Sequence, residues 1–372
     1  MKRIITTFVA VVLLVISPYY ATAQEPEELP GQELADELLD ITPNYAKKMA
    51  EKLGVNKITP ENLLSLEPTA FLSLGIEYAK QHISQPIKSV VCIIVVIIFC
   101  AVADVFRPNA EGTLGGVFSV VSALAVLAVL ATTTIESIKN VCEAASDFSD
   151  FMTGYVPIFA SAVSASGQTI SGGVYTGFMF LVCQIIAGIV SNFLMPMMTI
   201  YLAISLVSGI NLSLRLNIIA DTFKNCVNKT LGLSLTVFVG MMSLQSLVAA
   251  GSDNIAIKAG KYLIGNFVPV VGSAISEVFL SVQGYMKLMK NCIGWYGVAA
   301  AVLIFLPTLL EITFWRIAIH IAKLFSEALN VTSVAALLNA IASVFTMLIA
   351  FVLTFALLLI VTTTIMLATG MG

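Results

Sequence analysis

Long apolar runs separated by short polar segments make up most of the chain after residue 86. The first two runs cover residues 89–106 and 115–135, and a short turn that contains Arg107 joins them. Each run is close to the ~20 residues that a helix needs to cross a bilayer. The pattern predicts a transmembrane hairpin over residues 87–135, with Arg107 on the cytosolic side by the positive-inside rule.

The remaining apolar runs are less regular. Pro196 ends one run and Pro307 interrupts another, and the polar segments 211–230 and 311–330 have the helical spacing of an amphipathic helix. The last run exceeds the length of one span, so it is either one tilted helix or two segments. The apolar runs after residue 135 are these: 174–194, 197–209, 231–250, 293–310 and 335–370.

A ten-residue phrase occurs twice among these runs. Residues 155–164 read YVPIFASAVS and residues 267–276 read FVPVVGSAIS, with five identical positions. Because apolar and polar segments follow both copies in the same order, we predict an internal two-fold repeat in the membrane, over residues 136–250 and 251–372. The fold class is therefore an all-α polytopic membrane protein, with a hairpin followed by two repeats that Pro and Gly break.

The charges of the two repeats differ in sign. Residues 136–173 carry one lysine and four acidic residues, whereas residues 251–291 carry four lysines and two acidic residues. The positive-inside rule would place these segments on opposite sides, which makes the repeat inverted and requires residues 197–209 to cross. In the competing layout, residues 197–209 are re-entrant and the repeat is not inverted.

The N-terminal part of the chain is different in character. Residues 1–23 have the charged start, the apolar stretch and the A-T-A end of a cleaved signal peptide. Residues 24–86 carry eleven acidic residues against five lysines and predict short helices outside the cytosol. The composition, with 58% hydrophobic and 11% charged residues and a mean hydropathy of +0.96, agrees with an integral membrane protein.

Few residues suggest chemistry. The six cysteines form no C-x-x-C pair and the two histidines are far apart, so neither a disulfide framework nor a zinc site is expected. The motifs of P-loop nucleotide binding, serine hydrolases and zinc proteases are absent. We therefore predict no enzyme activity, no cofactor, no metal and no nucleic-acid partner.

Some polar residues in apolar surroundings are candidates for function. Asp104 lies within a predicted span, where a carboxylate is costly, although it is close enough to the boundary to reach water. Arg316, His320, Lys323 and Glu327 share one helical face, which lines either an aqueous path or the headgroup interface.

The proline phrases are the other candidates. They form either paired re-entrant elements around a central site or tight packing joints. Their candidate residues are these: Pro157 and Ser161 in the first copy, and Gly265, Asn266, Pro269, Gly272 and Ser273 in and beside the second.

The second copy also carries a family resemblance. Residues 261–284, KYLIGNFVPVVGSAISEVFLSVQG, and the following KNCIG at 290–294 resemble the stage III sporulation protein AE family. The G-N-F-V-P-V-V-G core is the most specific part. The order of signal peptide, acidic region and repeat-bearing membrane domain also resembles that family along nearly the whole chain.

The resemblance implies a non-enzymatic membrane component of a sporulation-specific, secretion-like channel complex. Such a protein would lie in the mother-cell membrane around the forespore, with its mature N-terminus extracytosolic. Its partners would be the lipid bilayer and other membrane proteins of the stage III complex, including a separately encoded ATPase. It would support late forespore gene expression and forespore integrity. The family has no established catalytic residues to carry over.

Two other functions stay open from the residues alone. An independent secondary permease is compatible with the duplicated Pro-broken segments, although few ionisable groups lie near the middle of the spans. A membrane-embedded enzyme has no motif to support it.

Overall fold

The computed structural model describes residues 32–64, 68–105, 113–189, 193, 195–210, 217–267 and 272–368. Every element within these ranges is a helix, which confirms the all-α prediction for the described part of the chain. The predicted signal peptide at residues 1–23 lies outside the described residues, and its cleavage stays a prediction.

Four short helices make up the described part of the N-terminal region. They are α2 (Gln32–Ile41), α3 (Asn44–Lys52), α4 (Pro60–Leu64) and α5 (Pro68–His82). Apolar positions three and four apart place Leu38 on the buried side of α2, while its acidic residues remain exposed. This region therefore docks through apolar stripes and keeps its charges on the outside.

Seven further helices follow in the part of the chain that the structure describes. Their bounds are these: α6 (Ser84–Val105), α7 (Thr113–Ala165), α8 (Thr169–Ile189), α9 (Met195–Ile210), α10 (Asn217–Phe267), α11 (Gly272–Ala328) and α12 (Thr332–Ala368). Among the described residues, α6, α7, α10, α11 and α12 are long and apolar enough to cross a membrane. The last apolar run is one continuous helix, α12, rather than two segments.

The long helices run through positions where the sequence suggests a break. α7 continues through Pro157 and α11 continues through Pro307. A proline in a helix removes one backbone hydrogen bond, but packing along the rest of the helix can outweigh that loss. The apolar run at 115–135, predicted as the second helix of the hairpin, and the polar segment after it form one continuous helix, α7. The two-fold repeat and its inversion stay predictions.

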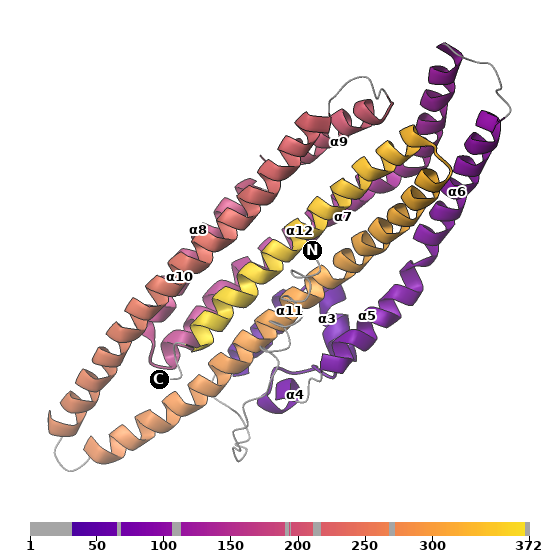
Figure 1. The fold of residues 1–372 in the computed structure, drawn as a ribbon. Helices are drawn as coiled ribbons and strands as arrows, with labels where there is room; N and C mark the ends of the chain where they lie inside the picture. Colours follow the sequence, from indigo (N-terminus) through magenta and orange to yellow (C-terminus); the bar gives the residue numbers. More distant parts are fainter. Residues whose placement is uncertain are drawn as a thin grey trace.

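α12 lies at the centre of the bundle (Figure 1). It is the most deeply buried of the five apolar helices. α11 packs along one side of it in the antiparallel direction, and α10 packs along another side in the parallel direction (Figure 1). The N-terminal helices and α6 lie on the α11 side, and α8 and α9 lie on the α10 side.

The turn between α11 and α12 is tightly bonded. Asn330 has a left-handed backbone with φ of 59°, a conformation that asparagine tolerates better than most residues. The Val331 N–H donates to the Ser326 carbonyl at 2.9 Å, and the buried Ser326 hydroxyl donates to the Val331 carbonyl at 2.8 Å. These two bonds fix the direction in which α12 turns back along α11.

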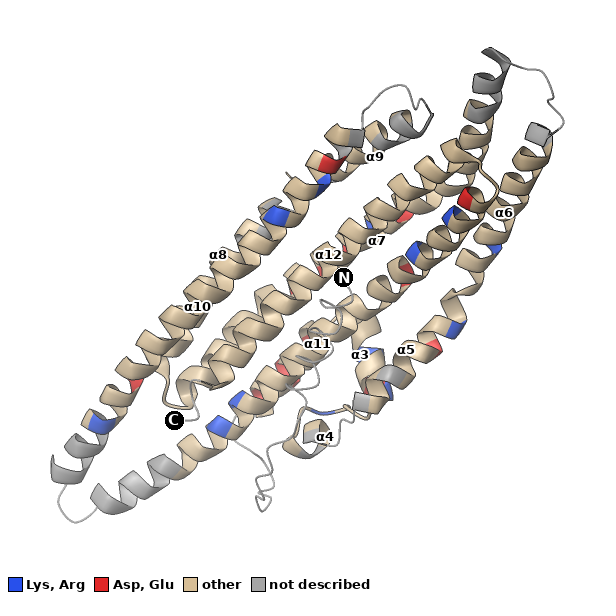
Figure 2. Cartoon of the chain, viewed as in Figure 1, with Lys and Arg blue, Asp and Glu red and all other residues tan. Residues whose placement is uncertain are grey.

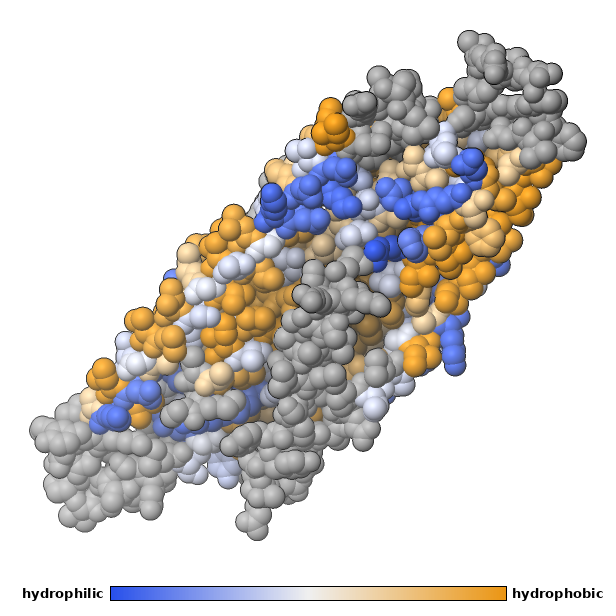
Figure 3. All heavy atoms as spheres, in the orientation of Figure 1, coloured by the Kyte–Doolittle hydropathy of each residue, from blue (hydrophilic) through white to orange (hydrophobic). Residues whose placement is uncertain are grey.

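Large apolar side chains cover the outer faces of α6 and α10 (Figure 3). Phe99 on α6 is 70% exposed, and Leu244 and Val248 on α10 are 69% and 73% exposed. Contiguous apolar surface of this kind indicates contact with lipid or with other proteins. Charged residues on α10 lie near its two ends, and α12 carries none (Figure 2).

Candidate functional site

The first proline phrase lies in α7 and packs tightly against α11. The side chains of Tyr155 and Phe159 are fully buried, and their rings stack at 5.5 Å. Two glycines of α11 allow these rings to pack against the backbone of α11. A Cβ on Gly297 would overlap the Tyr155 ring, and a Cβ on Gly294 would lie 3.0 Å from Phe159. Pro157 itself points away from the core and is exposed.

A hydrogen bond within α7 links the two candidate residues of this copy. The Ser161 hydroxyl donates to the Pro157 carbonyl at 2.8 Å, one turn away on the same exposed face. The two candidate residues of the first copy are therefore together, and they bond to each other rather than to a neighbouring helix. This copy lies within one continuous helix, and the choice between a packing joint and part of a central site stays a prediction.

The second copy gives no comparable test. Pro269 lies outside the described residues. For Gly265, Asn266, Gly272 and Ser273 only the helical backbone is described. The Asp104 side chain is also outside them, although its backbone belongs to the last turn of α6. The roles suggested for these residues stay predictions.

Buried polar side chains hold the turn between α7 and α8. Asp253 of α10 is 2% exposed, and its carboxylate accepts hydrogen bonds from the Ile170 and Ser171 N–H groups at 2.8 and 2.9 Å. These N–H groups lie in the first turn of α8 and therefore have no acceptor within their own helix. A negative charge at this end also interacts favourably with the helix dipole. A residue of one helix thus caps another that lies far away in sequence.

A buried lysine lies at the same turn. Lys290 of α11 is 1% exposed, and its Nζ donates to Oε1 of the buried Gln168 at 3.3 Å. No carboxylate among the described residues forms an ion pair with it. Gln283 of α11 packs against Gly167, whose φ of +93° and close approach both favour glycine. We call Gln168, Asp253, Gln283 and Lys290 the turn cluster.

Three cationic side chains converge on one face of α12 at a different level of the bundle. The acceptors Asn339, Ser343 and Thr346 follow one another at helical spacing and therefore share a face. The bonds are these: Lys323 Nζ to Asn339 Oδ1 at 2.9 Å, Lys224 Nζ to Ser343 Oγ at 3.3 Å and Arg316 Nε to Thr346 Oγ1 at 3.0 Å. We call Lys224, Arg316 and Lys323 the α12 cation cluster.

This cluster contains part of the polar face expected from the sequence. Arg316 and Lys323 of α11 both reach α12, and Glu327 forms an ion pair with Lys323 at 3.5 Å. His320, on the same helix, is exposed and forms none of these bonds. Lys224 comes from α10, and sequence spacing gave no sign that it would join residues almost a hundred positions later.

The N-terminal helices contact the C-terminal half of α7 and the middle of α11. The Tyr296 hydroxyl of α11 donates to Thr42 Oγ1 at 3.1 Å, and Ile41 packs against Gly154 of α7. Tyr45 lies against the Ile304 carbonyl of α11. Burial, and then the charge of Asp147, raise the pKa of the Tyr45 phenol.

A second polar contact joins α7 and α11 beside α5. The Asn140 amide donates to both carboxylate oxygens of Glu311, at 3.2 and 3.1 Å. Burial and the charge of Glu311 raise the pKa of Tyr78 in α5. Glu311 of α11 therefore lies on the side of the bundle that α5 covers.

Sequence reasoning missed the turn cluster. Asp253 and Lys290 are charged residues next to apolar runs, which usually means a solvated helix end. The available signal was the Ser- and Gly-rich segment 166–173, whose turn needs a partner for its free N–H groups. Among the described residues, no three His, Cys, Asp or Glu side chains lie together as a metal site would require.

Comparison with known proteins decides the family. The family model described as stage III sporulation protein AE matches residues 55–370. The chain belongs to the stage III sporulation protein AE family. The resemblance seen in residues 261–284 is thereby confirmed, and the match extends from the N-terminal helices to the end of α12.

One relative in this family is stage III sporulation protein AE of Bacillus subtilis (strain 168). It is 26% identical over 156 residues, which cover 42% of this chain and 39% of that protein. The aligned region thus spans well under half of the relative. No solved structure matches the chain.

Proposed function

We propose that this member of the stage III sporulation protein AE family is a non-enzymatic membrane component of a channel-like complex between mother cell and forespore. The observation that carries the sporulation role is the family match over residues 55–370. The five apolar helices support a place in a membrane. Its part would be to support late forespore gene expression and forespore integrity.

Several polar side chains join one helix to another, which favours a structural role for the protein. Asp253 caps α8, Asn140 joins α7 to α11, and Tyr296 holds Thr42 of the N-terminal region. Groups that are hydrogen-bonded between helices stabilise one arrangement and are not presented to a substrate. A separately encoded ATPase would then supply energy, and other membrane proteins of the complex would bind the outer faces.

The N-terminal helices are the best candidate for contact across the intermembrane space. α2 exposes Glu33, Asp36, Glu37 and Asp40 while its apolar stripe is buried. An exposed acidic face steers basic partners toward it. In this proposal the mother-cell membrane holds the bundle, and the mature N-terminus is extracytosolic.

A deletion in the native host tests the proposal. We expect an in-frame deletion to abolish a late forespore-transcription reporter and to shrink forespores after engulfment, with both restored by the intact gene. The measurement is reporter fluorescence and forespore size in sporulating cells. Normal spores from the deletion strain, in the absence of a second copy of the gene, would contradict the proposal.

An independent permease is the second candidate, because Asp253 and Lys290 are buried ionisable groups within long apolar helices. Both lie next to the apolar runs, where buried charges can line the entrance of a substrate or ion pathway. The two functions differ in what the purified chain does alone. Ion or solute flux in vesicles that contain only this protein would favour the permease, whereas a component of a larger complex should be silent there.

A further inference from the structure

Two members of the α12 cation cluster have no acidic partner. Lys323 has Glu327, but Lys224 and Arg316 form no ion pair with a carboxylate of the described residues. Both are only partly buried, so an anion can reach them. They contact neighbouring turns of α12 from its two sides, since Lys224 is on α10 and Arg316 is on α11.

Hydrophilic residues cover α10 and α11 on the same face at this level, in the upper part of the space-filling view (Figure 3). Ser343 and Thr346 lie on α12 between the two helices; the Ser343 hydroxyl accepts from Lys224 and keeps its own hydrogen for a ligand, whereas the Thr346 hydroxyl already donates to the Ala342 carbonyl. Two cations flanking hydroxyl groups make a setting that suits a phosphate group, which accepts several hydrogen bonds at once.

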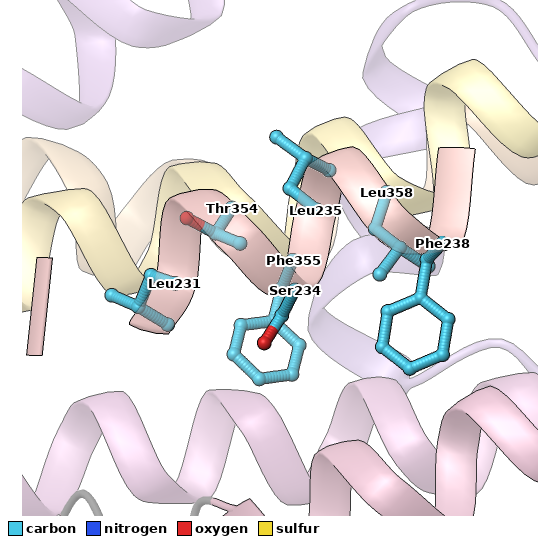
Figure 4. A pocket seen from close by; sticks show the side chains of 7 residues that line it. All are labelled: Leu231, Ser234, Leu235, Phe238, Thr354, Phe355 and Leu358. Carbon is cyan, nitrogen blue, oxygen red and sulfur yellow. The ribbon is translucent and has the colours of Figure 1, made fainter. Parts of the chain in front are cut away.

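An apolar groove lies between α10 and α12 further along both helices (Figure 4). Its lining residues, contributed by these two helices, are these: Leu231, Ser234, Leu235, Phe238, Thr354, Phe355 and Leu358. The groove is shallow and open on one side, with a volume of about 20 Å³. Leu231 follows Lys224 by seven residues and Phe238 by fourteen, so the groove runs from ~10 to ~21 Å beyond the lysine at 1.5 Å per residue.

The composition of α10 places this groove next to lipid. No charged residue occurs from 230 to 252, and the outward side chains of Leu233, Val237 and Leu244 are exposed. A run of this length matches the hydrocarbon thickness of a bilayer. Lys224 and Lys229 lie just before it, where basic residues meet phosphate headgroups.

We propose that the α12 cation cluster and the adjoining groove form a binding site for an anionic phospholipid. The phosphate contacts Arg316 and Lys224, and one acyl chain lies along Leu231, Leu235 and Phe238. Guanidinium groups suit phosphate because they donate two parallel hydrogen bonds. The lipid joins α10 to α11 through its headgroup, and its chain lies over the shallow groove between α10 and α12.

The combination of head and tail distinguishes this ligand from a free anion. A soluble phosphate would use the cations and leave the groove empty. A zwitterionic lipid would fill the groove but would bring its own cation to the cluster. An anionic phospholipid is the ligand that uses both parts, and this inference does not depend on the sporulation role.

Native mass spectrometry of the purified full-length protein tests the site. The protein is exchanged into detergent that contains phosphatidylglycerol or phosphatidylcholine, and retained lipid is counted. We expect the unmodified chain to retain phosphatidylglycerol preferentially, and the double variant Lys224→Gln with Arg316→Gln to retain at least tenfold less. Lys258→Gln with Lys287→Gln removes two exposed lysines elsewhere on α10 and α11 and should retain lipid as the unmodified chain does.

A second variant keeps the cations and closes the groove. Ser234→Phe places a ring in the groove and should also lower retention of phosphatidylglycerol, with the thermal unfolding midpoint preserved. Inorganic phosphate is added as a separate arm and should neither stabilise the protein nor displace the lipid. Equal retention by the Lys224/Arg316 variant, equal loss in the Lys258/Lys287 control, or stabilisation by phosphate alone would each overturn the proposal.

Discussion

Close contacts between single residues fix how α7 meets α11. Tyr155 packs directly onto the backbone of Gly297, and this approach is possible because glycine has no Cβ. The sequence predicted that the first phrase would be either a re-entrant element or a packing joint. It could not choose between them, because the glycine that accommodates Tyr155 lies about 140 positions away and belongs to no recognisable motif.

Gly297→Ala should destabilise the protein. The added methyl overlaps the buried Tyr155 ring, and overpacking of this kind costs about 1–3 kcal/mol of unfolding free energy. The measurement is unfolding by SDS in mixed micelles.

Gly240→Ala is the matched control, since nothing lies within 4 Å of the position of its added Cβ. It should be neutral or stabilising by up to about 1 kcal/mol, because alanine favours a helix more than glycine does. An equal loss in both variants would mean that the close approach of Tyr155 is not the cause.

Helix ends depend on residues that belong to other helices. The turn between α7 and α8 is predictable from Ser, Gly and Gln at 166–168, but its capping residue is Asp253 of α10. Periodicity predicted the existence of most apolar helices. It placed extra boundaries near residues 135, 250 and 310, where charged residues begin, because a charge pattern does not distinguish a helix end from a helix that continues past the apolar run.

Asp253→Ala should loosen the first turn of α8. Removing the carboxylate leaves the Ile170 and Ser171 N–H groups without their acceptor, and losing a helix cap costs about 0.5–2 kcal/mol. Hydrogen exchange at residues 169–173 should become faster, with a smaller effect for Asp253→Asn, which retains one acceptor oxygen.

Asp221→Ala serves as the control for this change. Asp221 is an exposed acidic residue of the same helix, so its replacement should leave exchange at residues 169–173 unchanged. If Asp253→Ala also leaves exchange there unchanged, the capping bond contributes little to the stability of the turn.

The whole molecule combines a large apolar bundle with a small acidic region docked on its side. The sequence predicted both parts and their order. It did not predict that α2 and α3 would contact the C-terminal half of α7 and the middle of α11, because docking depends on which side of a long helix is free. Leu38 is fully buried at this docking surface, and its neighbour Glu37 is exposed.

Leu38→Ala should release the N-terminal region before it affects the bundle. Truncating a buried leucine to alanine costs about 2–5 kcal/mol, and this loss falls on the docked helices. Hydrogen exchange across residues 32–58 should rise while α12 stays protected. Glu37→Ala should change neither segment, and equal deprotection of α12 in the Leu38 variant would show that the region and the bundle unfold as one unit.

The bonded turn at Ser326 and Val331 has a consequence for how the bundle can open. Because two hydrogen bonds hold this short turn, α11 and α12 form a rigid antiparallel pair. Sliding of one helix along the other by a helical turn would break the turn. α10 has no such short connection to α12, and the space between them is filled only in part. The seam that can open without breaking this pair is therefore the one between α10 and α12, on the side of the molecule that faces away from the acidic helices.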